Sequence, residues 1–217
     1  MVKAVIFDLD GTILDTEKYY RICWPAACEH FGFHVTEEMY LQMRSLGRPF
    51  AYDKFREWFG SEFNYNEVRS YRKKLYEELV AKKGIHPKDG AREALDYLKE
   101  KNILRAIATA TDMERTLSYL KAVGLDKSFD KICSAADCRF GKPAPDVYLN
   151  ALRELGLEPS ECIAVEDAPN GILSAYSAGL RVVFIPDQTA EEPEVSDKIY
   201  MTIRSLNEIN IVIEQTI

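Results

Sequence analysis

The first stretch of the chain combines a short apolar strand with two closely spaced carboxylates, and this combination restricts the fold more than any other. Val2 and the run from Ala4 to Phe7 are apolar and are interrupted only by Lys3. Their length and β-branched content predict a buried strand of a parallel sheet. Asp8 and Asp10 follow and mark the carboxyl end of this strand, because aspartate is a poor strand former. In open α/β sheets, ligands bind at this end of the strands.

Two carboxylates at one strand end repel each other, which costs free energy unless a cation or a proton neutralises them. Asp8 and Asp10 are separated by one residue, and Gly11 follows where the chain must turn. A Mg²⁺ ion prefers hard oxygen ligands and would neutralise the pair. The alternative is a solvated turn, because aspartate and glycine are also typical turn residues. The pattern Asp-x-Asp-Gly alone leaves both interpretations open.

The next segment, residues 17–84, is expected to contain helices only. Pro25 should kink or divide the first of these helices, because proline removes a backbone donor. Thr36 and Asn64 are suitable caps for the second and the fourth. The four expected helices cover about Glu17 to His30, Thr36 to Gly47, Ala51 to Phe59 and Asn64 to Lys83.

From residue 85 onward, helical and strand patterns alternate, which predicts right-handed crossovers and a doubly wound parallel sheet. We therefore expect an α/β fold, with a Rossmann-like core formed by residues 1–16 and 85–217 and an inserted all-helical cap formed by residues 17–84. An insertion after the first strand would stand directly above its acids. Helices are expected over Ala91 to Lys101, Met113 to Val123, Asp146 to Leu155 and Pro169 to Ala178, with strands over Leu104 to Ala108, Lys131 to Ser134, Glu161 to Val165 and Arg181 to Ile185, and a short edge strand and helix after Asp187.

The composition of the chain limits the partners that the protein is expected to bind and the cellular compartment in which it is expected to function. A formal net charge of −7 argues against nucleic acid as a partner, because phosphate backbones require a basic face. No apolar stretch approaches the roughly 20 residues that span a bilayer, and the first strand lacks the features of a signal peptide. The five cysteines form no Cys-x-x-Cys pair, which is typical of reduced thiols. We expect a cytoplasmic protein that is a monomer and binds no membrane.

The string Phe7-Asp8-Leu9-Asp10-Gly11-Thr12 resembles the first motif of the haloacid dehalogenase superfamily, whose members use an aspartate nucleophile for phosphoryl transfer. Three later stretches resemble the other motifs, in the family's order and spread over nearly the whole chain. The second is the strand that ends in Thr109 and Ala110. The third is Lys142 within Gly-Lys-Pro-Ala-Pro, where the prolines stiffen the loop. The fourth is the pair Glu166-Asp167. Taken alone, Thr109 is more typical of a helix cap.

The resemblance implies a covalent mechanism. Asp8 would be the nucleophile that forms an aspartyl phosphate, and Asp10 would act first as general acid and then as general base. The hydroxyl of Thr109, the N–H of Ala110 and the ammonium of Lys142 would bind the phosphate. The cofactor would be Mg²⁺, and its implied ligands are Asp8, the backbone carbonyl of Asp10, Glu166 and Asp167.

The cap resembles that of the subgroup that contains β-phosphoglucomutases and sugar-phosphate phosphatases. Mutases of this subgroup carry a His in the first cap helix and a Gly-x-x-Arg loop; the corresponding positions here are Tyr20 and, after Gly47, Phe50, with Arg48 two residues early. Gly47, Arg48 and Phe50 are therefore the candidate substrate-contacting residues of the cap. The aromatic residues after Gly47 predict an apolar loop that offers little to a second phosphate.

The expected function is that of a Mg²⁺-dependent phosphatase acting on a small phosphorylated metabolite, a sugar phosphate in particular. The first alternative is a β-phosphoglucomutase-type mutase, which shares the core machinery. A phosphonoacetaldehyde hydrolase would need a cap lysine for a Schiff base, for which Lys54 is a candidate. A catalytically silent binding module on the same fold is the alternative from another class.

Overall fold

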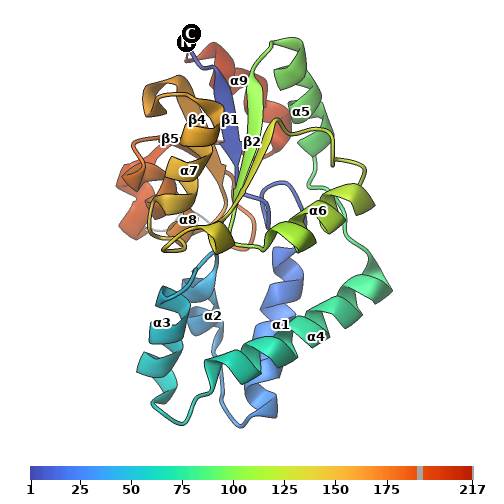
Figure 1. Cartoon of the computed structure of the whole chain (residues 1–217), viewed down its shortest axis with the longest axis vertical. Coiled ribbons are helices and arrows are strands. Elements are labelled where there is room, and N and C mark those ends of the chain that lie inside the picture. The colour runs from blue at the N-terminus through green and yellow to red at the C-terminus, as the bar shows by residue number, and fades with distance from the viewer. Residues whose placement is uncertain (190–192, 217) are drawn as a thin grey trace.

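The computed structural model describes residues 1–189 and 193–216 and has two parts, an α/β core above and a helical cap below in the view of Figure 1. In the described residues, six strands form one parallel sheet in the order β3-β2-β1-β4-β5-β6. The strands are β1 (Ala4–Phe7), β2 (Leu104–Thr109), β3 (Lys131–Ser134), β4 (Cys162–Glu166), β5 (Arg181–Phe184) and β6 (Ile199–Thr202). The predicted doubly wound α/β fold is thereby confirmed.

Strand β1 lies in the middle of this sheet, between β2 and β4. Its four residues are all buried, and alternate side chains enter two different cores. Val5 and Phe7 belong to the core on one face, whereas Ala4 and Ile6 belong to the core on the other. A strand covered on both faces can be apolar at every position, which explains why the run has no alternating pattern.

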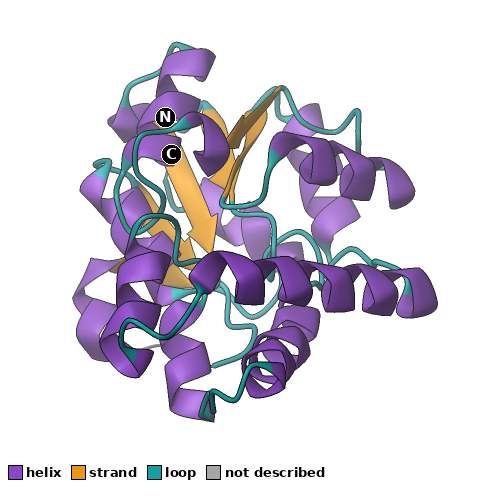
Figure 2. Cartoon of the chain, turned by 60° about the horizontal axis from the view of Figure 1, so that its bottom comes forward, coloured by secondary structure: helices purple, strands orange, loops and turns teal. Residues whose placement is uncertain are grey.

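Helices cover both faces of the sheet (Figure 2). Helices α5, α6 and α9 contribute buried residues to the core that contains Val5 and Phe7, and α7 and α8 contribute to the opposite core. Their bounds are Ala91–Glu100 for α5, Met113–Ala122 for α6, Asp146–Leu155 for α7, Pro169–Ser177 for α8 and Ile209–Glu214 for α9. Short 3₁₀ turns occupy Ala135–Asp137, Pro159–Glu161, Pro193–Lys198 and Leu206–Glu208.

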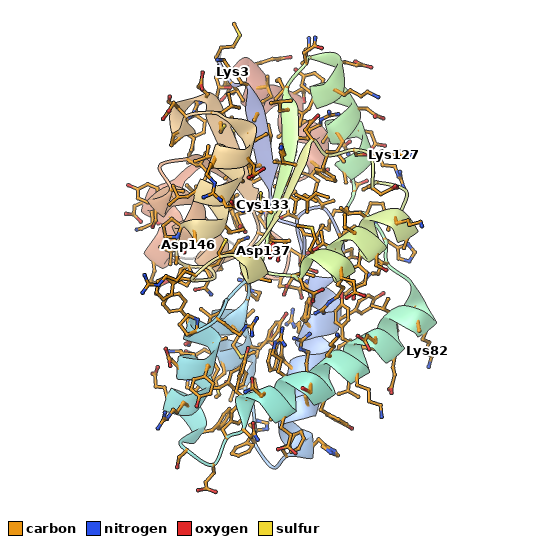
Figure 3. All side chains as sticks on the ribbon, viewed as in Figure 1. Lys3, Lys82, Lys127, Cys133, Asp137 and Asp146 are labelled. Atoms are coloured by element: carbon orange, nitrogen blue, oxygen red, sulfur yellow. The ribbon has the colours of Figure 1, made fainter. Side chains whose placement is uncertain are left out.

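The cap consists of α1 (Glu17–His30), α2 (Glu37–Met43), α3 (Phe50–Phe59) and α4 (Tyr65–Lys83). It has a core of its own, in which Tyr40, Phe55 and Phe63 are buried. Lys3, before β1, lies at the end of the molecule away from the cap, whereas Asp137, after β3, lies at the boundary between the two parts (Figure 3). The carboxyl ends of the strands therefore face the cap.

Helix α1 continues through Pro25 as one helix, so of the two expected outcomes division does not occur. The helix packs along α4, where Tyr20 stacks on Tyr76 with ring centroids 4.4 Å apart, and such packing offsets the one lost hydrogen bond. One detail of the cap differs from the sequence prediction. Helix α2 ends at Met43 rather than at Gly47, because Arg44 has an extended ψ of 131°. The Arg44 side chain runs into the core, where Nη1 donates to the backbone carbonyl of Asp167.

Among the described residues, no helix is long and apolar enough to cross a membrane.

Candidate active site

Three buried carboxylates meet at the carboxyl ends of β1 and β4, which are neighbours in the sheet. Asp8 follows β1, Glu166 ends β4 and Asp167 is the next residue. Each offers an oxygen, and these oxygens lie within 4.8 Å of one another. The parallel pairing of β1 with β4 sets this proximity, because it brings Phe7 opposite Val165 and hence the residues that follow into register.

Lys142 reaches this acidic cluster from the loop before α7. Its ammonium donates to Asp8 Oδ1 at 2.5 Å and to Glu166 Oε1 at 2.6 Å. Tyr148, on α7, also donates to Glu166 Oε1, at 2.5 Å. Lys142 and Glu166 are fully buried, so solvent does not screen this ion pair. The lysine that the sequence motif singled out therefore lies against the nucleophile candidate.

The cluster contains more negative than positive charge. Burial, together with the carboxylates of Glu166 and Asp10, raises the pKa of Asp8 to about 8 against the attraction of Lys142. Burial, followed by the charge of Asp8, also raises the pKa of Asp167 well above its ordinary value. Burial disfavours the ammonium of Lys142, but the carboxylates of Asp8 and Glu166 outweigh this effect and raise its pKa. Three ionised acids facing one ammonium would leave two negative charges without partners.

The same three acids each keep one buried oxygen without a hydrogen-bond partner among the described residues: Asp8 Oδ2, Glu166 Oε2 and Asp167 Oδ2. Oxygen donors and an excess of two negative charges suit a divalent cation such as Mg²⁺. Two glycines leave room for these oxygens. A Cβ at Gly171 would stand 2.0 Å from Glu166 Oε2, and a Cβ at Gly11 would stand 2.4 Å from Asp167 Oδ2. The residues of this site therefore fit a metal ion.

We predict that Mg²⁺ stabilises the metal-free protein. At a concentration a hundredfold above Kd the gain would be about 2.7 kcal/mol, read as a rise in melting temperature. The rise should be larger at pH 8 than at pH 6, because protons compete for carboxyls whose pKa is raised, as that of Asp8 is, to about 8. Without metal, ionising these carboxyls costs the folded protein free energy, because their pKa is higher in the folded than in the unfolded chain. The metal-free protein should therefore lose stability as the pH rises from the ordinary carboxyl pKa, about 4, toward 8.

Thermal unfolding followed by circular dichroism measures both effects. The variant Asp167→Asn removes one charged ligand and should lose most of the Mg²⁺-induced rise, whereas Asp126→Asn, at an exposed position, should keep it. A melting temperature that does not respond to Mg²⁺ at either pH would exclude a metal at Asp8, Glu166 and Asp167.

Asp10 does not lie in the carboxylate cluster that offers metal ligands. Its carboxylate accepts one hydrogen bond from Thr16 Oγ1 at 2.6 Å and another from Thr111 Oγ1 at 2.7 Å. Thr111 comes from the loop after β2, so this bond joins two strand ends. Two fixed hydroxyls orient the carboxylate toward the cavity that it lines, which is the placement that a proton-transferring group requires. Thr111 was not predicted from the sequence; the feature that marks it is a second hydroxyl side chain two residues after Thr109.

Thr109 is the last residue of β2 and is completely buried. Its Oγ1 accepts a hydrogen bond from the backbone N–H of Thr111 at 3.0 Å. In that bond Thr109 is the acceptor, so its hydroxyl hydrogen remains available to a bound anion. Ala110, the next residue, lines the cavity. Of the two motif residues, Ala110 therefore lines the cavity, whereas Thr109 lies just behind its described lining.

A cavity of about 600 Å³ lies between the core and the cap, and Asp8 and Asp10 line it from the core. Gly47 and Arg48 line it from the cap, as the sequence analysis expects. Phe50 is not among its lining residues; its ring lies 6.3 Å from that of Phe140. Phe140 does line the cavity, so Phe50 lies behind a lining residue, and its contact with substrate stays a prediction.

The cap side of the cavity is cationic, which corrects the expectation of an apolar loop. The expectation considered only the aromatic residues after Gly47, whereas Arg48 lines the cavity from this loop and Arg69 and Arg72 line it from helix α4. On α4, Arg69 and Arg72 recur with Tyr65 and Tyr76 at the spacing of one helix face. The arginines that line the cavity are Arg44, Arg48, Arg69, Arg72, Arg115 and Arg139.

Glu17, the first residue of α1, also lines the cavity and was not singled out from the sequence. It is buried, and its carboxylate accepts a hydrogen bond from Tyr40 Oη at 2.9 Å. Burial and then the nearby charge of Asp10 raise its pKa to about 8. No pattern in the sequence marks this residue, because a glutamate in the first turn of a helix is ordinarily exposed.

The cap loop is bonded directly to the lysine loop. The N–H of Gly47 donates to the carbonyl of Lys142 at 2.7 Å, and the N–H of Gly141 donates to the carbonyl of Arg48 at 2.8 Å. A Cβ at Gly47 would stand 2.6 Å from the Cα of Gly141. The cap is therefore closed over the site through a backbone contact that leaves no room for a side chain.

We predict that Gly47→Ala prevents this closure and lowers kcat/KM by at least about tenfold, because a misplaced lid mis-sets the reacting groups. Steady-state kinetics measures the effect. Gly60→Ala is the matched control: Gly60 is also in the cap, its φ is +77°, and a Cβ there would meet no atom within 4 Å. This control should lose stability through backbone strain but keep its kinetics. Equal kinetics in Gly47→Ala and the control would contradict a closed cap during turnover.

The fold and the site together define a class of enzyme: a doubly wound α/β core with an aspartate–lysine centre beneath an inserted helical cap, which carries out phosphoryl transfer. The model of the haloacid dehalogenase-like hydrolase family matches residues 5–185. The chain belongs to this family.

Individual relatives include both phosphatases and mutases. A phosphorylated carbohydrates phosphatase from Thermotoga maritima is 29% identical over 217 residues, which cover 98% of this chain and 91% of the relative. A β-phosphoglucomutase from Bacillus subtilis is 30% identical over 190 residues, which cover 84% of this chain and 82% of the relative. The crystal structure of β-phosphoglucomutase from Clostridium difficile superposes with a TM-score of 0.84 at 24% identity, covering 100% of this chain and 97% of that one.

Proposed function

We propose that this enzyme is a Mg²⁺-dependent phosphomonoester hydrolase that acts on a small phosphorylated metabolite, a sugar phosphate in particular. The observation that carries the proposal is the position of Asp8, which lines the cavity together with Asp10 and binds the buried Lys142, itself paired with Glu166. Asp8 would be the nucleophile, Lys142 its countercharge and Asp10 the proton carrier. The name of the Thermotoga maritima relative supports a carbohydrate phosphate as substrate.

In the proposed reaction, a carboxylate oxygen of Asp8 attacks phosphorus while the bond from phosphorus to the ester oxygen breaks. Asp10 gives its proton to the departing oxygen, and the alcohol leaves. Asp10 then takes a proton from water, whose oxygen attacks phosphorus and releases phosphate and free Asp8. Thr109, Ala110 and Lys142 hold the phosphoryl oxygens throughout.

The metal would be held by the free oxygens of Asp8, Glu166 and Asp167 together with the backbone carbonyl of Asp10. When bound, it supplies positive charge next to the phosphoryl group. The carboxylate of Asp10 is not one of these metal ligands, because it accepts hydrogen bonds from two threonine hydroxyls. Without a metal on it, this carboxylate can carry the proton.

We also propose that residues 1–16 and 85–217 form the core domain and that residues 17–84 form the cap domain. We further propose that the enzyme is a cytoplasmic monomer and that it binds neither membranes nor nucleic acid. The separate hydrophobic core of the cap supports the domain division, and the net charge of −7 supports the exclusion of nucleic acid.

A mutase is the second candidate, since the cavity has arginines on its cap side. Hydrolysis is favoured because Tyr20 and Phe50 stand where mutases of this subgroup resemble one another in carrying His and Arg. Incubation with β-glucose 1-phosphate and a trace of the 1,6-bisphosphate distinguishes the two activities. Release of inorganic phosphate from simple monoesters, without formation of glucose 6-phosphate, is the expected result. Steady isomerisation without net hydrolysis would establish the mutase.

A further inference from the structure

Tyr148 is a buried tyrosine of α7 to which the proposed reaction gives no task. Its side chain is completely buried and is not among the residues that line the cavity. Its Oη nevertheless donates a hydrogen bond to Glu166 Oε1 at 2.5 Å. Burial and then the charges of Glu166 and Asp8 raise the pKa of Tyr148 well above its ordinary value, so the hydroxyl stays protonated and remains a donor. Tyr148 therefore binds an acid of the carboxylate cluster without facing the space open to substrate.

Two donors meet at the same oxygen of Glu166. Besides Tyr148, Lys142 Nζ donates to Oε1, at 2.6 Å. A carboxylate oxygen has two lone pairs, so these two hydrogen bonds occupy Oε1 completely. The other oxygen, Oε2, is buried and has no hydrogen-bond partner among the described residues. Glu166 therefore has one oxygen that the protein holds and one that is left for a cation.

Both donors come from one stretch of the chain. Lys142 lies in the loop before α7, and Tyr148 lies in the first turn of this helix. Lys142 Nζ is also 5.2 Å from the centroid of the Tyr148 ring, a distance at which an aromatic ring attracts a cation. The ring thus supports the ammonium while the hydroxyl holds the carboxylate, so the position of Glu166 depends on Tyr148 in two ways.

The backbone of α8 lies against the same carboxylate. A Cβ at Gly171, in the first turn of α8, would stand 2.0 Å from Glu166 Oε2 and 2.3 Å from Glu166 Oε1. The carboxylate is therefore confined between Gly171 and its two donors. It cannot turn both oxygens toward one ion without breaking hydrogen bonds, and we expect it to offer an ion Oε2 alone.

This restraint matters because divalent cations differ in the carboxylates that they accept. Mg²⁺ is small and requires a near-ideal octahedron of oxygens. Ca²⁺ is larger, takes about six to eight oxygens in a flexible arrangement and accepts both oxygens of one carboxylate. A glutamate that can offer only one oxygen therefore favours the smaller ion.

We propose that Tyr148 is a positioning residue that sets the cation selectivity of the site: together with Lys142 it occupies Glu166 Oε1, leaves this glutamate one free oxygen and thereby favours Mg²⁺ over Ca²⁺. The proposal rests on the proposed Mg²⁺-dependent function and adds to it a residue that contacts neither substrate nor metal. Loss of the hydroxyl frees a lone pair on Oε1, which suits Ca²⁺ better than the strict octahedron of Mg²⁺.

Metal titration of Tyr148→Phe tests this role without turnover. The variant keeps the buried ring and loses only the hydroxyl. We would measure the Kd of Mg²⁺ and the Kd of Ca²⁺ for the metal-free protein by isothermal titration calorimetry. The ratio of the Ca²⁺ Kd to the Mg²⁺ Kd should fall by at least about tenfold in the variant, the effect of losing one hydrogen bond to a charged group. A merely structural role would weaken the binding of both cations alike, so an unchanged ratio would overturn the proposal.

Tyr19→Phe is the matched control. Tyr19 is also buried, and its hydroxyl donates to the carbonyl of Gly84 at 2.9 Å, outside the carboxylate cluster, so this variant should keep the ratio. A crystal structure of the wild-type protein with Ca²⁺ tests the same claim without a variant. It should show Glu166 facing the ion through Oε2 alone, with Oε1 still bound to Tyr148. An equal fall of the ratio in the control, or a wild-type Glu166 that binds Ca²⁺ through both oxygens, would contradict the proposal.

Failure of this role and failure of the proposed function give different results. If the wild-type protein binds Mg²⁺ and releases phosphate from an aryl phosphate only in its presence, but its selectivity does not depend on Tyr148, the function stands and the positioning role is wrong. If the wild-type protein binds neither cation in the titration, the Mg²⁺ dependence itself is wrong, and the role of Tyr148 falls with it.

Discussion

Asp8→Asn is expected to lower kcat by at least about a thousandfold, because removal of a nucleophile leaves only the surrounding binding groups to act. The amide is nearly the same size as the carboxylate, so the fold should be retained. It cannot attack phosphorus as an anion, and it removes one charge from the group formed with Glu166 and Asp167. Phosphate release at saturating substrate and Mg²⁺ measures the loss.

The matched control is Asp126→Asn, which makes the same chemical change at an exposed position and should keep wild-type turnover. Circular dichroism and the melting temperature show whether Asp8→Asn is folded. A folded Asp8→Asn variant that retains more than about a hundredth of the wild-type rate would contradict covalent catalysis by this residue.

Lys142→Met is expected to affect stability as well as activity. Lys142 is completely buried and binds Asp8 and Glu166 at once. Removal of one partner from a buried ion pair typically costs about 3–5 kcal/mol, because the remaining charges stay buried without a partner. We expect a loss of this size in urea unfolding of the metal-free protein at pH 8, where the carboxyls are most ionised, together with loss of turnover. Mg²⁺ should restore part of the stability.

Lys131→Met serves as the control for this substitution. Lys131 pairs with Glu154 at 3.4 Å, and both side chains are more than two-fifths exposed. Surface pairs of this kind contribute about 0–1 kcal/mol, so the control should change stability little. Equal losses in the two lysine variants would show that the buried ion network does not hold the site together.

The core of the fold could be predicted from local patterns because its elements are strongly marked. Strand β1 is a short apolar run that ends in two acids, and α7 begins and ends at the residues expected, Asp146 and Leu155. Three of the four motifs lie at the ends of strands β1, β2 and β4, and a parallel sheet brings neighbouring strand ends together. Lys142 contacts Asp8 from the loop before α7, although 134 positions separate the two residues.

The cap side of the site could not be predicted in the same way, because its residues come from helix faces and not from motifs. Arg72 and Tyr20 lie on two helices, α4 and α1, whose mutual orientation is set by aromatic packing. A single sequence shows which residues share a helix face, but not which face turns toward the cavity. The arginines on α4 were missed for this reason.

The close approach of Gly47 to Gly141 could not be predicted from the sequence either. Neither glycine needs a left-handed backbone, so the sequence offers no turn signal that distinguishes them. Their role becomes visible only when the two loops are placed side by side, where each N–H binds a carbonyl of the other loop.

Trapping of the covalent intermediate tests the central claim most directly. In Asp10→Ala, p-nitrophenyl phosphate should still transfer its phosphoryl group, because nitrophenolate leaves without a proton, whereas hydrolysis of the aspartyl phosphate should slow for lack of a base. We predict a burst of about one equivalent of nitrophenolate per enzyme and, after reduction with borohydride, homoserine at position 8 identified by mass spectrometry. A burst followed by homoserine at another carboxylate, or turnover with neither burst nor homoserine, would contradict Asp8 as the nucleophile.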